Sequence, residues 1–147
     1  MTTSTLWNQI RTRYNLHWHV IFTHFPISFF MVSAGFIVLH LFTNTECFEL
    51  AGFISLVAGV VVLIPTAVTG WKTWKSKYKG ASTYLFRYKI RIAFAMTALS
   101  IVLIIARVFL VSTGHNIWHI TFGTGFLLLF IGAMTEGYYG GRLNHYT

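Results

Sequence analysis

Apolar residues along this chain are grouped into long runs that are separated by short polar segments. Four runs are each about 20 residues long, the length that a helix needs to cross the hydrocarbon core of a bilayer. They cover residues 20–42, 50–70, 90–111 and 117–135. Each run is apolar on all sides of a helix, as lipid-exposed helices are. The pattern predicts an all-α integral membrane four-helix bundle that forms a single domain over residues 1–147.

The composition favours the same fold. Apolar residues make up 55% of the chain and charged residues 10%, whereas a soluble domain has about 25% charged residues. A soluble bundle of these helices would therefore lack the polar side chains that cover a water-exposed surface. The single cysteine, Cys47, excludes an internal disulfide and any cysteine-rich metal or iron–sulfur site.

Basic residues are distributed unevenly between the polar segments. Lys and Arg occur in the amino-terminal tail, between the second and third runs, and in the carboxyl-terminal tail. Segments 43–49 and 112–116 contain neither, and the first of them holds Glu46 and Glu49. The positive-inside rule therefore places both termini in the cytoplasm, an N-in/C-in topology. The same distribution explains the net charge of +8 without a nucleic acid partner.

Small residues and prolines predict how the helices pack. Small residues recur at helical spacing in two runs: Ala51, Ser55 and Gly59 in the second, Gly125 and Gly132 in the fourth. Such stripes let helix backbones approach closely within lipid. Pro26 and Pro65 lie within the first two runs, where they predict local kinks near the cytoplasmic side.

Two histidines are expected near the outer side of the bundle. His40 lies near the end of the first run and His119 near the start of the fourth. Because these two helices run in opposite directions, both side chains reach a similar depth. Two neutral imidazoles that face each other across helices are the axial ligands of a b-type haem. Arg107, about one turn inside this layer, is a candidate partner of a haem propionate. Its alternative partners are Glu46, Glu49 or outer lipid head groups.

His115 is a competing haem ligand. If His115 and His119 share a helix, they lie one turn apart on the same face. Asn116 is a favourable N-cap residue, however, which leaves His115 in the loop and His119 in the first turn. We therefore prefer His119. The alternative interpretation is that both histidines are interfacial residues that hydrogen-bond loop carbonyl groups.

Three further histidines are expected at the cytoplasmic side: His17, His19 and His24. His24 is inside the first run and is a candidate ligand of a second haem, whose other ligand comes from another subunit or from Met134. A quinone site is the other interpretation, in which His24 hydrogen-bonds a quinone carbonyl and Glu136 exchanges protons. His19 is a further candidate for cofactor binding at this side. For His17 and His19 the alternative is interfacial anchoring. His24 lies about 24 Å from His40 along a helix, so the two belong to separate sites.

The stretch from His19 to Ile27, HVIFTHFPI, resembles the opening motif of a widespread family of four-helix bacterial membrane domains of unknown function. That motif, H-x4-H-F-P-I, is matched by His19, His24 and Pro26, and the glycine-bearing end of the second run, around Gly70, is also similar. Family members carry an acidic residue after the second span and a histidine at the start of the third. This chain has Trp71-Lys72 and Arg87-Tyr88-Lys89 instead. The resemblance implies a multi-pass protein of the bacterial inner membrane, and some relatives are linked with rubredoxin-like redox modules.

These observations favour a b-type cytochrome-like electron-transfer subunit rather than a stand-alone enzyme. One haem b, or two, would be held by helix histidines and would exchange electrons with quinone or with a larger respiratory or photosynthetic complex. The expected partners are membrane lipid and other membrane or redox subunits, in an oligomer or larger complex. The alternative is a non-catalytic accessory subunit that binds pigment or lipid. A transporter is disfavoured because no pair of interrupted helices and no mid-bilayer acidic residue occurs.

Overall fold

The computed structural model describes the backbone of residues 3–77, 79–80, 84–110 and 117–145. Side chains are described within residues 19–76, 79–80, 84–109 and 122–142. Over these residues the regular secondary structure is entirely helical. The four helices are α1 Thr3–Thr43, α2 Glu46–Lys77, α3 Tyr84–Leu110 and α4 Ile117–His145. The predicted all-α fold with four helices is therefore confirmed.

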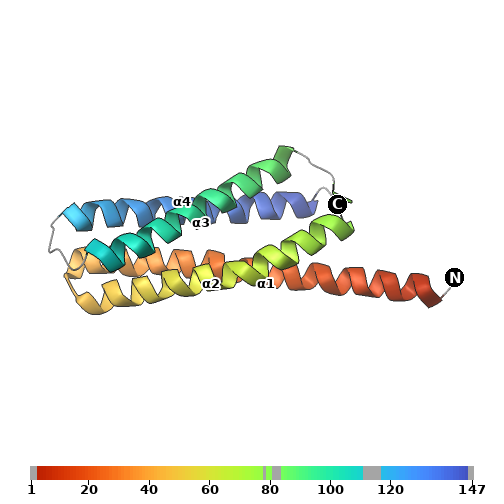
Figure 1. Cartoon of the computed structure of the whole chain (residues 1–147), viewed down its shortest axis with the longest axis horizontal. Helices are drawn as coiled ribbons and strands as arrows, with labels where there is room; N and C mark the ends of the chain where they lie inside the picture. Colours follow the sequence, from red (N-terminus) through yellow and green to blue (C-terminus); the bar gives the residue numbers. More distant parts are fainter. Residues whose placement is uncertain (1–2, 78, 81–83, 111–116, 146–147) are drawn as a thin grey trace.

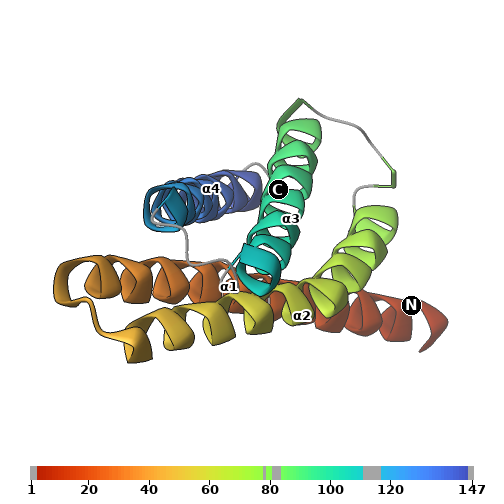
Figure 2. The same cartoon turned by 60° about the vertical axis from the view of Figure 1, so that its left-hand side comes forward.

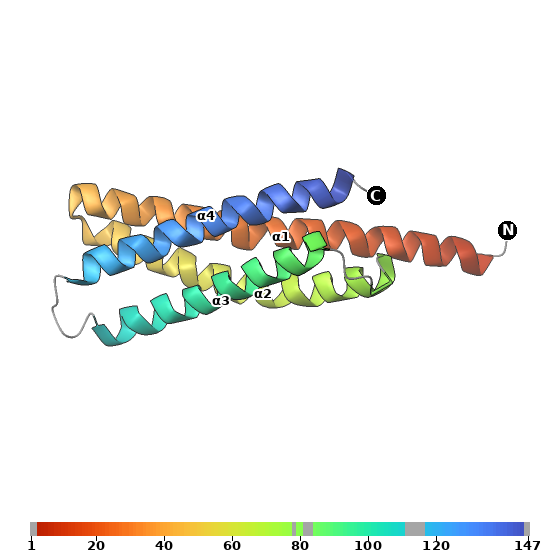
Figure 3. The same ribbon diagram turned by 90° about the horizontal axis from the view of Figure 1, so that it is seen from above.

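The helices form an antiparallel bundle in which each one packs beside its neighbours in the chain, and α4 returns to α1 (Figure 1; Figure 3). The contact between α1 and α2 is the most extensive, and among helices that follow one another in the chain α2 and α3 have the smallest contact. The helix α3 is inclined to the α1–α2 pair (Figure 1; Figure 2). We call the end with the Asn44–Thr45 turn the His40 end, and the opposite end, where α2 and α4 finish, the basic end.

Three of the helices are long and apolar enough to cross a membrane. The qualifying segments of the described chain are His19–Thr43, Glu46–Ser76 and Tyr84–Phe109. Large apolar side chains cover the outside of the bundle, including Phe94 at 74% exposed and Ile64 at 68% exposed. Such a surface is stable in lipid and not in water. The fourth apolar run, 117–135, is also helical, as part of α4.

Glycines bring α1 and α2 into close contact. A Cβ atom on Gly59 would lie 2.7 Å from Cε1 of Phe30, and one on Gly52 would lie 3.2 Å from the Ser33 carbonyl oxygen. At the same place the Ser33 hydroxyl donates a hydrogen bond to the Gly52 carbonyl oxygen. The small-residue stripe predicted on this helix is confirmed at Gly59. The second close contact is made by Gly52 and not by Ala51, because Gly52 is the residue that faces α1.

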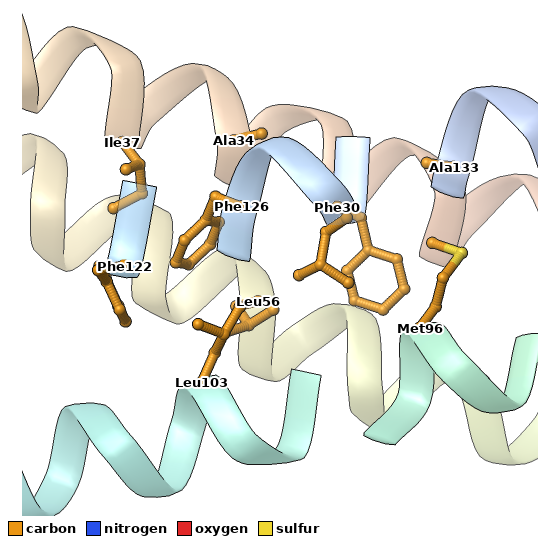
Figure 4. Close-up of a cluster of buried hydrophobic side chains, with 10 residues drawn as sticks. Phe30, Ala34, Ile37, Leu56, Met96, Leu103, Phe122, Phe126 and Ala133 are labelled. Atoms are coloured by element: carbon orange, nitrogen blue, oxygen red, sulfur yellow. The ribbon is translucent and has the colours of Figure 1, made fainter. Parts of the chain in front are cut away.

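The glycines of α4 make the corresponding contact with α3. A Cβ atom would lie 2.6 Å from Cδ2 of Leu103 if placed on Gly125, and 2.8 Å from the Met96 side chain if placed on Gly132. Both predicted packing positions are therefore confirmed. Between the two helix pairs lies one apolar core, to which all four helices contribute (Figure 4). Its residues are Phe30, Ala34, Ile37, Leu56, Met96, Leu103, Phe122, Phe126, Leu129 and Ala133.

Both prolines lie inside helices that continue past them. Pro26 has no N–H group, so the carbonyl oxygen of Phe22, four residues earlier, loses its helical donor. The Thr66 hydroxyl of α2 lies 2.9 Å from that oxygen and 2.8 Å from the Val62 carbonyl oxygen of its own helix. A neighbouring hydroxyl is one way in which helices in lipid satisfy a carbonyl that a proline releases.

We expect Gly59→Ala to destabilise the bundle by about 1–3 kcal/mol, because the added methyl group overlaps the buried Phe30 ring. Gly35→Ala is the matched control, since a Cβ atom there has no neighbour within 4 Å. Thermal unfolding of both variants in detergent micelles checks the difference. Equal melting temperatures for the two variants would show that the α1–α2 contact is not tight.

Candidate functional site

A two-residue turn at the His40 end joins α1 to α2. Asn44 has a φ of 50°, a left-handed conformation that asparagine tolerates better than most residues. Its N–H group donates to the His40 carbonyl oxygen at 2.8 Å, which closes the last turn of α1. The first turn of α2 holds Glu46 and Glu49, and negative charge is favourable at a helix amino terminus. The turn therefore fixes the position of His40 relative to α2.

The His40 side chain is buried at this turn and its ring orientation is defined. Its Nδ1 atom lies 3.0 Å from the Thr45 carbonyl oxygen. A carbonyl oxygen only accepts hydrogen bonds, so Nδ1 carries the proton. In the neutral imidazole the lone pair is then on Nε2. Histidines that bind metals or haem iron through Nε2 are commonly oriented by this type of Nδ1–H···O=C bond.

The start of α4 lies at the same end of the bundle as His40 (Figure 1). His119 is in the first turn of that helix, but its side chain lies outside the described residues, so the pairing of His40 with His119 stays a prediction. A Cβ atom on Gly123 would lie 3.2 Å from Cδ1 of Leu41, which shows that α1 and α4 are close at this end. The competing ligand His115 lies outside the described residues.

Arg107 forms a bidentate ion pair with Glu49. Its Nε atom donates to Oε1 at 2.8 Å and its terminal Nη2 atom donates to Oε2 at 2.9 Å. The guanidinium group also lies over the Phe53 ring, 5.1 Å from its centroid. Glu49 was one of the alternative partners that the sequence offered. A haem propionate at Arg107 would have to share the guanidinium group with this carboxylate.

An apolar groove of about 580 Å³ runs between α1 and α4, next to Leu39 and Leu41, the sequence neighbours of His40. It is lined almost wholly by apolar side chains and includes Gly35, Phe36 and Leu39 of α1 with Gly123 and Leu127 of α4. The glycines open the groove because they have no side chain. It offers contact for an apolar molecule and no polar group to orient one.

At the basic end, His19 points from α1 towards α2. Its Nδ1 atom lies 3.3 Å from the Thr69 hydroxyl oxygen, and a Cβ atom on Gly70 would lie 2.9 Å from its Cε1 atom. The absence of a side chain at Gly70 therefore makes room for the imidazole ring. His19 was assigned to interfacial anchoring as the alternative, and this contact was not foreseen. The signal for it is a seven-residue spacing on α1: His19, Pro26, Ser33 and His40.

His24 and Met134 are on the outside of the bundle. Both side chains are exposed, Met134 at 54%. Exposure does not choose between the two predicted sources of the other ligand of a second haem at His24, Met134 or another subunit, so both arrangements stay predictions. Among the side chains that the structure describes, no group of three or more His, Cys, Asp or Glu residues is placed to hold a metal ion.

Lys89 and Glu136 form a second ion pair, inside the basic end. The Nζ–Oε2 distance is 3.5 Å and Glu136 is only 8% exposed. Its other oxygen, Oε1, is buried and has no hydrogen-bond partner among the described residues. Gly140 leaves space for the ammonium group, which lies 3.1 Å from where a Cβ atom would be. Burial raises the pKa of the Glu136 carboxyl, and the Lys89 ammonium opposes that rise.

We expect Glu49→Gln to destabilise the protein by about 1–3 kcal/mol, because it leaves the guanidinium group of Arg107 without its anionic partner. The two side chains are only 15% and 23% exposed, so water replaces the lost contact poorly. Glu46→Gln is the matched control at an exposed position of the same helix turn. Unfolding of Glu49→Gln, Arg107→Gln and the double variant measures the coupling. Additive effects in the double variant would contradict a direct interaction.

The chain matches no protein-family model. It also matches no curated protein and no solved structure. The resemblance to the four-helix family stays a prediction that rests on His19, His24, Pro26 and the segment around Gly70.

Proposed function

We propose that this protein is a membrane electron-transfer subunit that holds a b-type haem at its His40 end. Nε2 of His40 is one axial ligand and His119, at the start of α4, is the other. The observation that carries the proposal is the hydrogen bond from His40 Nδ1 to the Thr45 carbonyl oxygen, at 3.0 Å. It fixes the tautomer and the ring orientation that an axial histidine needs.

The surroundings of His40 suit a haem site. Haem supplies the one-electron chemistry, and the protein contributes ligands, orientation and a low dielectric. His40 is buried, and its sequence neighbours Leu39 and Leu41 line the apolar groove. The Arg107–Glu49 pair is on the neighbouring helices at the same end, where the guanidinium group is a donor for a propionate.

The membrane arrangement is part of the proposal. We infer that all four helices cross the bacterial inner membrane with both termini in the cytoplasm, which makes the basic end the cytoplasmic one. The support is the charge difference between the two ends. Lys72, Lys75 and Arg142 are exposed at the basic end, whereas the turn at the His40 end is followed by Glu46 and Glu49. The positive-inside rule then sets the orientation.

A second candidate function is an accessory subunit that binds a pigment or lipid. The observation that favours it is the apolar groove between α1 and α4, which would accept an acyl chain or a flat apolar ring. Exposed His24 is a further polar group on the outer surface of α1. The two functions differ in whether the purified protein shows a reducible iron.

We expect the full-length protein, purified from cells supplied with haem, to show sharp α and β absorption bands after reduction with dithionite. His40→Ala should abolish these bands because it removes an axial ligand, and His119→Ala should do the same. His24→Ala is the matched control and should retain them, since its side chain is exposed on α1. Visible spectra of the four proteins at equal concentration, with circular dichroism to show that each is helical, test the assignment.

A colourless wild-type protein with full helical content would overturn the haem proposal. Bands that do not respond to dithionite would favour the pigment-binding subunit. Bands lost in His115→Ala and kept in His119→Ala would make His115 the second ligand.

The topology is tested with the single native cysteine. Cys47 is exposed in the first turn of α2, at the His40 end, so we expect a membrane-impermeant maleimide to label it in cells with a permeabilised outer membrane. The control is Cys47→Ser combined with Ser76→Cys, which moves the thiol to an exposed position at the basic end. That variant should react only after the inner membrane is opened. The reverse pattern would show that the chain is inserted the other way.

A further inference from the structure

The chain has only three acidic side chains, and they are in three different environments. Glu46 is exposed. Both oxygens of Glu49 accept hydrogen bonds from Arg107, at 2.8 and 2.9 Å. Glu136 is 8% exposed, has a single cation 3.5 Å from Oε2, and has no donor for Oε1 among the described residues. In the Arg107–Glu49 pair both carboxylate oxygens therefore have a partner, whereas in the Lys89–Glu136 pair only Oε2 has one among the described residues.

The charged and polar groups of the basic end come from all four helices. Lys89 of α3 is its ion-pair partner, and the ammonium group of Lys89 also acts electrostatically on His19 of α1. The Tyr88 and Tyr139 rings meet edge to face above this region, 5.0 Å apart. On α2 the buried hydroxyl of Thr73 already donates to a carbonyl oxygen of its own helix. The lysines of α2, Lys72 and Lys75, are exposed.

An ionised Glu136 leaves part of its negative charge on Oε1, a buried oxygen for which the described residues supply no donor. Buried charge in this state is unfavourable unless it is fully paired and hydrogen-bonded. A proton on Oε1 removes that charge, while the nearby ammonium group of Lys89 still favours the ionised form. The two effects oppose each other at the same carboxyl group. The Lys89 side chain is 21% exposed, so the ion pair lies next to the surface of the basic end.

We propose that Glu136 is a proton-binding site of the bundle, open to the aqueous phase at the basic end. A proton from water is added to the Oε1 atom and converts the carboxylate to a neutral carboxyl group, while Lys89 stays an ammonium group. The ligand is the proton itself. Glu49, at the opposite end, differs from Glu136 in that both of its oxygens accept hydrogen bonds from Arg107. The site is separate from His40 and does not depend on haem.

Infrared spectroscopy on the full-length protein in lipid nanodiscs tests the proposal. Glutamate labelled with carbon-13 at the side-chain carboxyl group shifts the bands of Glu46, Glu49 and Glu136 away from those of the carboxyl terminus. We expect a protonated carboxyl band that persists at pH values where solvated carboxylates are fully ionised, and that disappears reversibly as the pH is raised further. Glu136→Gln should remove this band, and the control Glu46→Gln should keep it.

A second variant covers the case in which Glu136→Gln does not fold. Lys89→Gln removes the cation and keeps the carboxyl group, so the titration of the band should move to higher pH. Lys89→Arg keeps the positive charge and should leave the titration close to that of the wild type. The proposal is overturned if no labelled glutamate is protonated above the range of solvated carboxylates. It is also overturned if the band survives in Glu136→Gln, or if Lys89→Gln leaves the titration unmoved.

Discussion

The close contact between α1 and α2 is the constraint on which the remaining packing depends. At Gly52 and Gly59 the two backbones approach so closely that a single methyl group would overlap the neighbouring helix. In lipid the hydrophobic effect does not drive helices together, so van der Waals contact and hydrogen bonds between helices have to do so. Both are concentrated here: the Phe30 ring fills the space above Gly59 and the Ser33 hydroxyl bonds to Gly52.

Polar side chains between the helices follow from the same geometry. A seven-residue repeat keeps one face of a helix turned towards its partner. On α2 the repeat is Gly52, Gly59, Thr66 and Thr73. Its first three members contact α1: Gly52 at Ser33, Gly59 at Phe30 and Thr66 at the Phe22 carbonyl oxygen. Glycine occupies the half of this interface towards the His40 end, and threonine occupies the half towards the basic end. The helices are therefore joined by close apolar packing in one half and by hydroxyl groups in the other.

Much of the fold could be predicted because the length of each apolar run, and the position of Lys and Arg between the runs, can be read directly from the sequence. The helices, their order and the packing glycines of α4 follow from that pattern. The site was harder to predict, because a histidine within an apolar run does not show which side of the helix it occupies. His24 is exposed and His19 faces α2. The two differ in spacing: His19 lies seven residues before the buried Pro26, in the repeat that continues to Ser33 and His40, and His24 is outside this repeat. The Lys89–Glu136 contact joins residues on two helices, and no local pattern in the sequence indicates it.

The proline in α1 makes two distant positions depend on each other. Pro26 removes the donor of the Phe22 carbonyl oxygen, and the Thr66 hydroxyl of α2 replaces it. Valine at position 66 would keep the shape of threonine but remove this hydrogen bond, whereas alanine at position 26 would restore the helical donor and make the hydroxyl dispensable. Substitutions at these two positions are therefore tolerated in some combinations and not in others. Any redesign of the bundle has to treat the proline and the threonine as one unit.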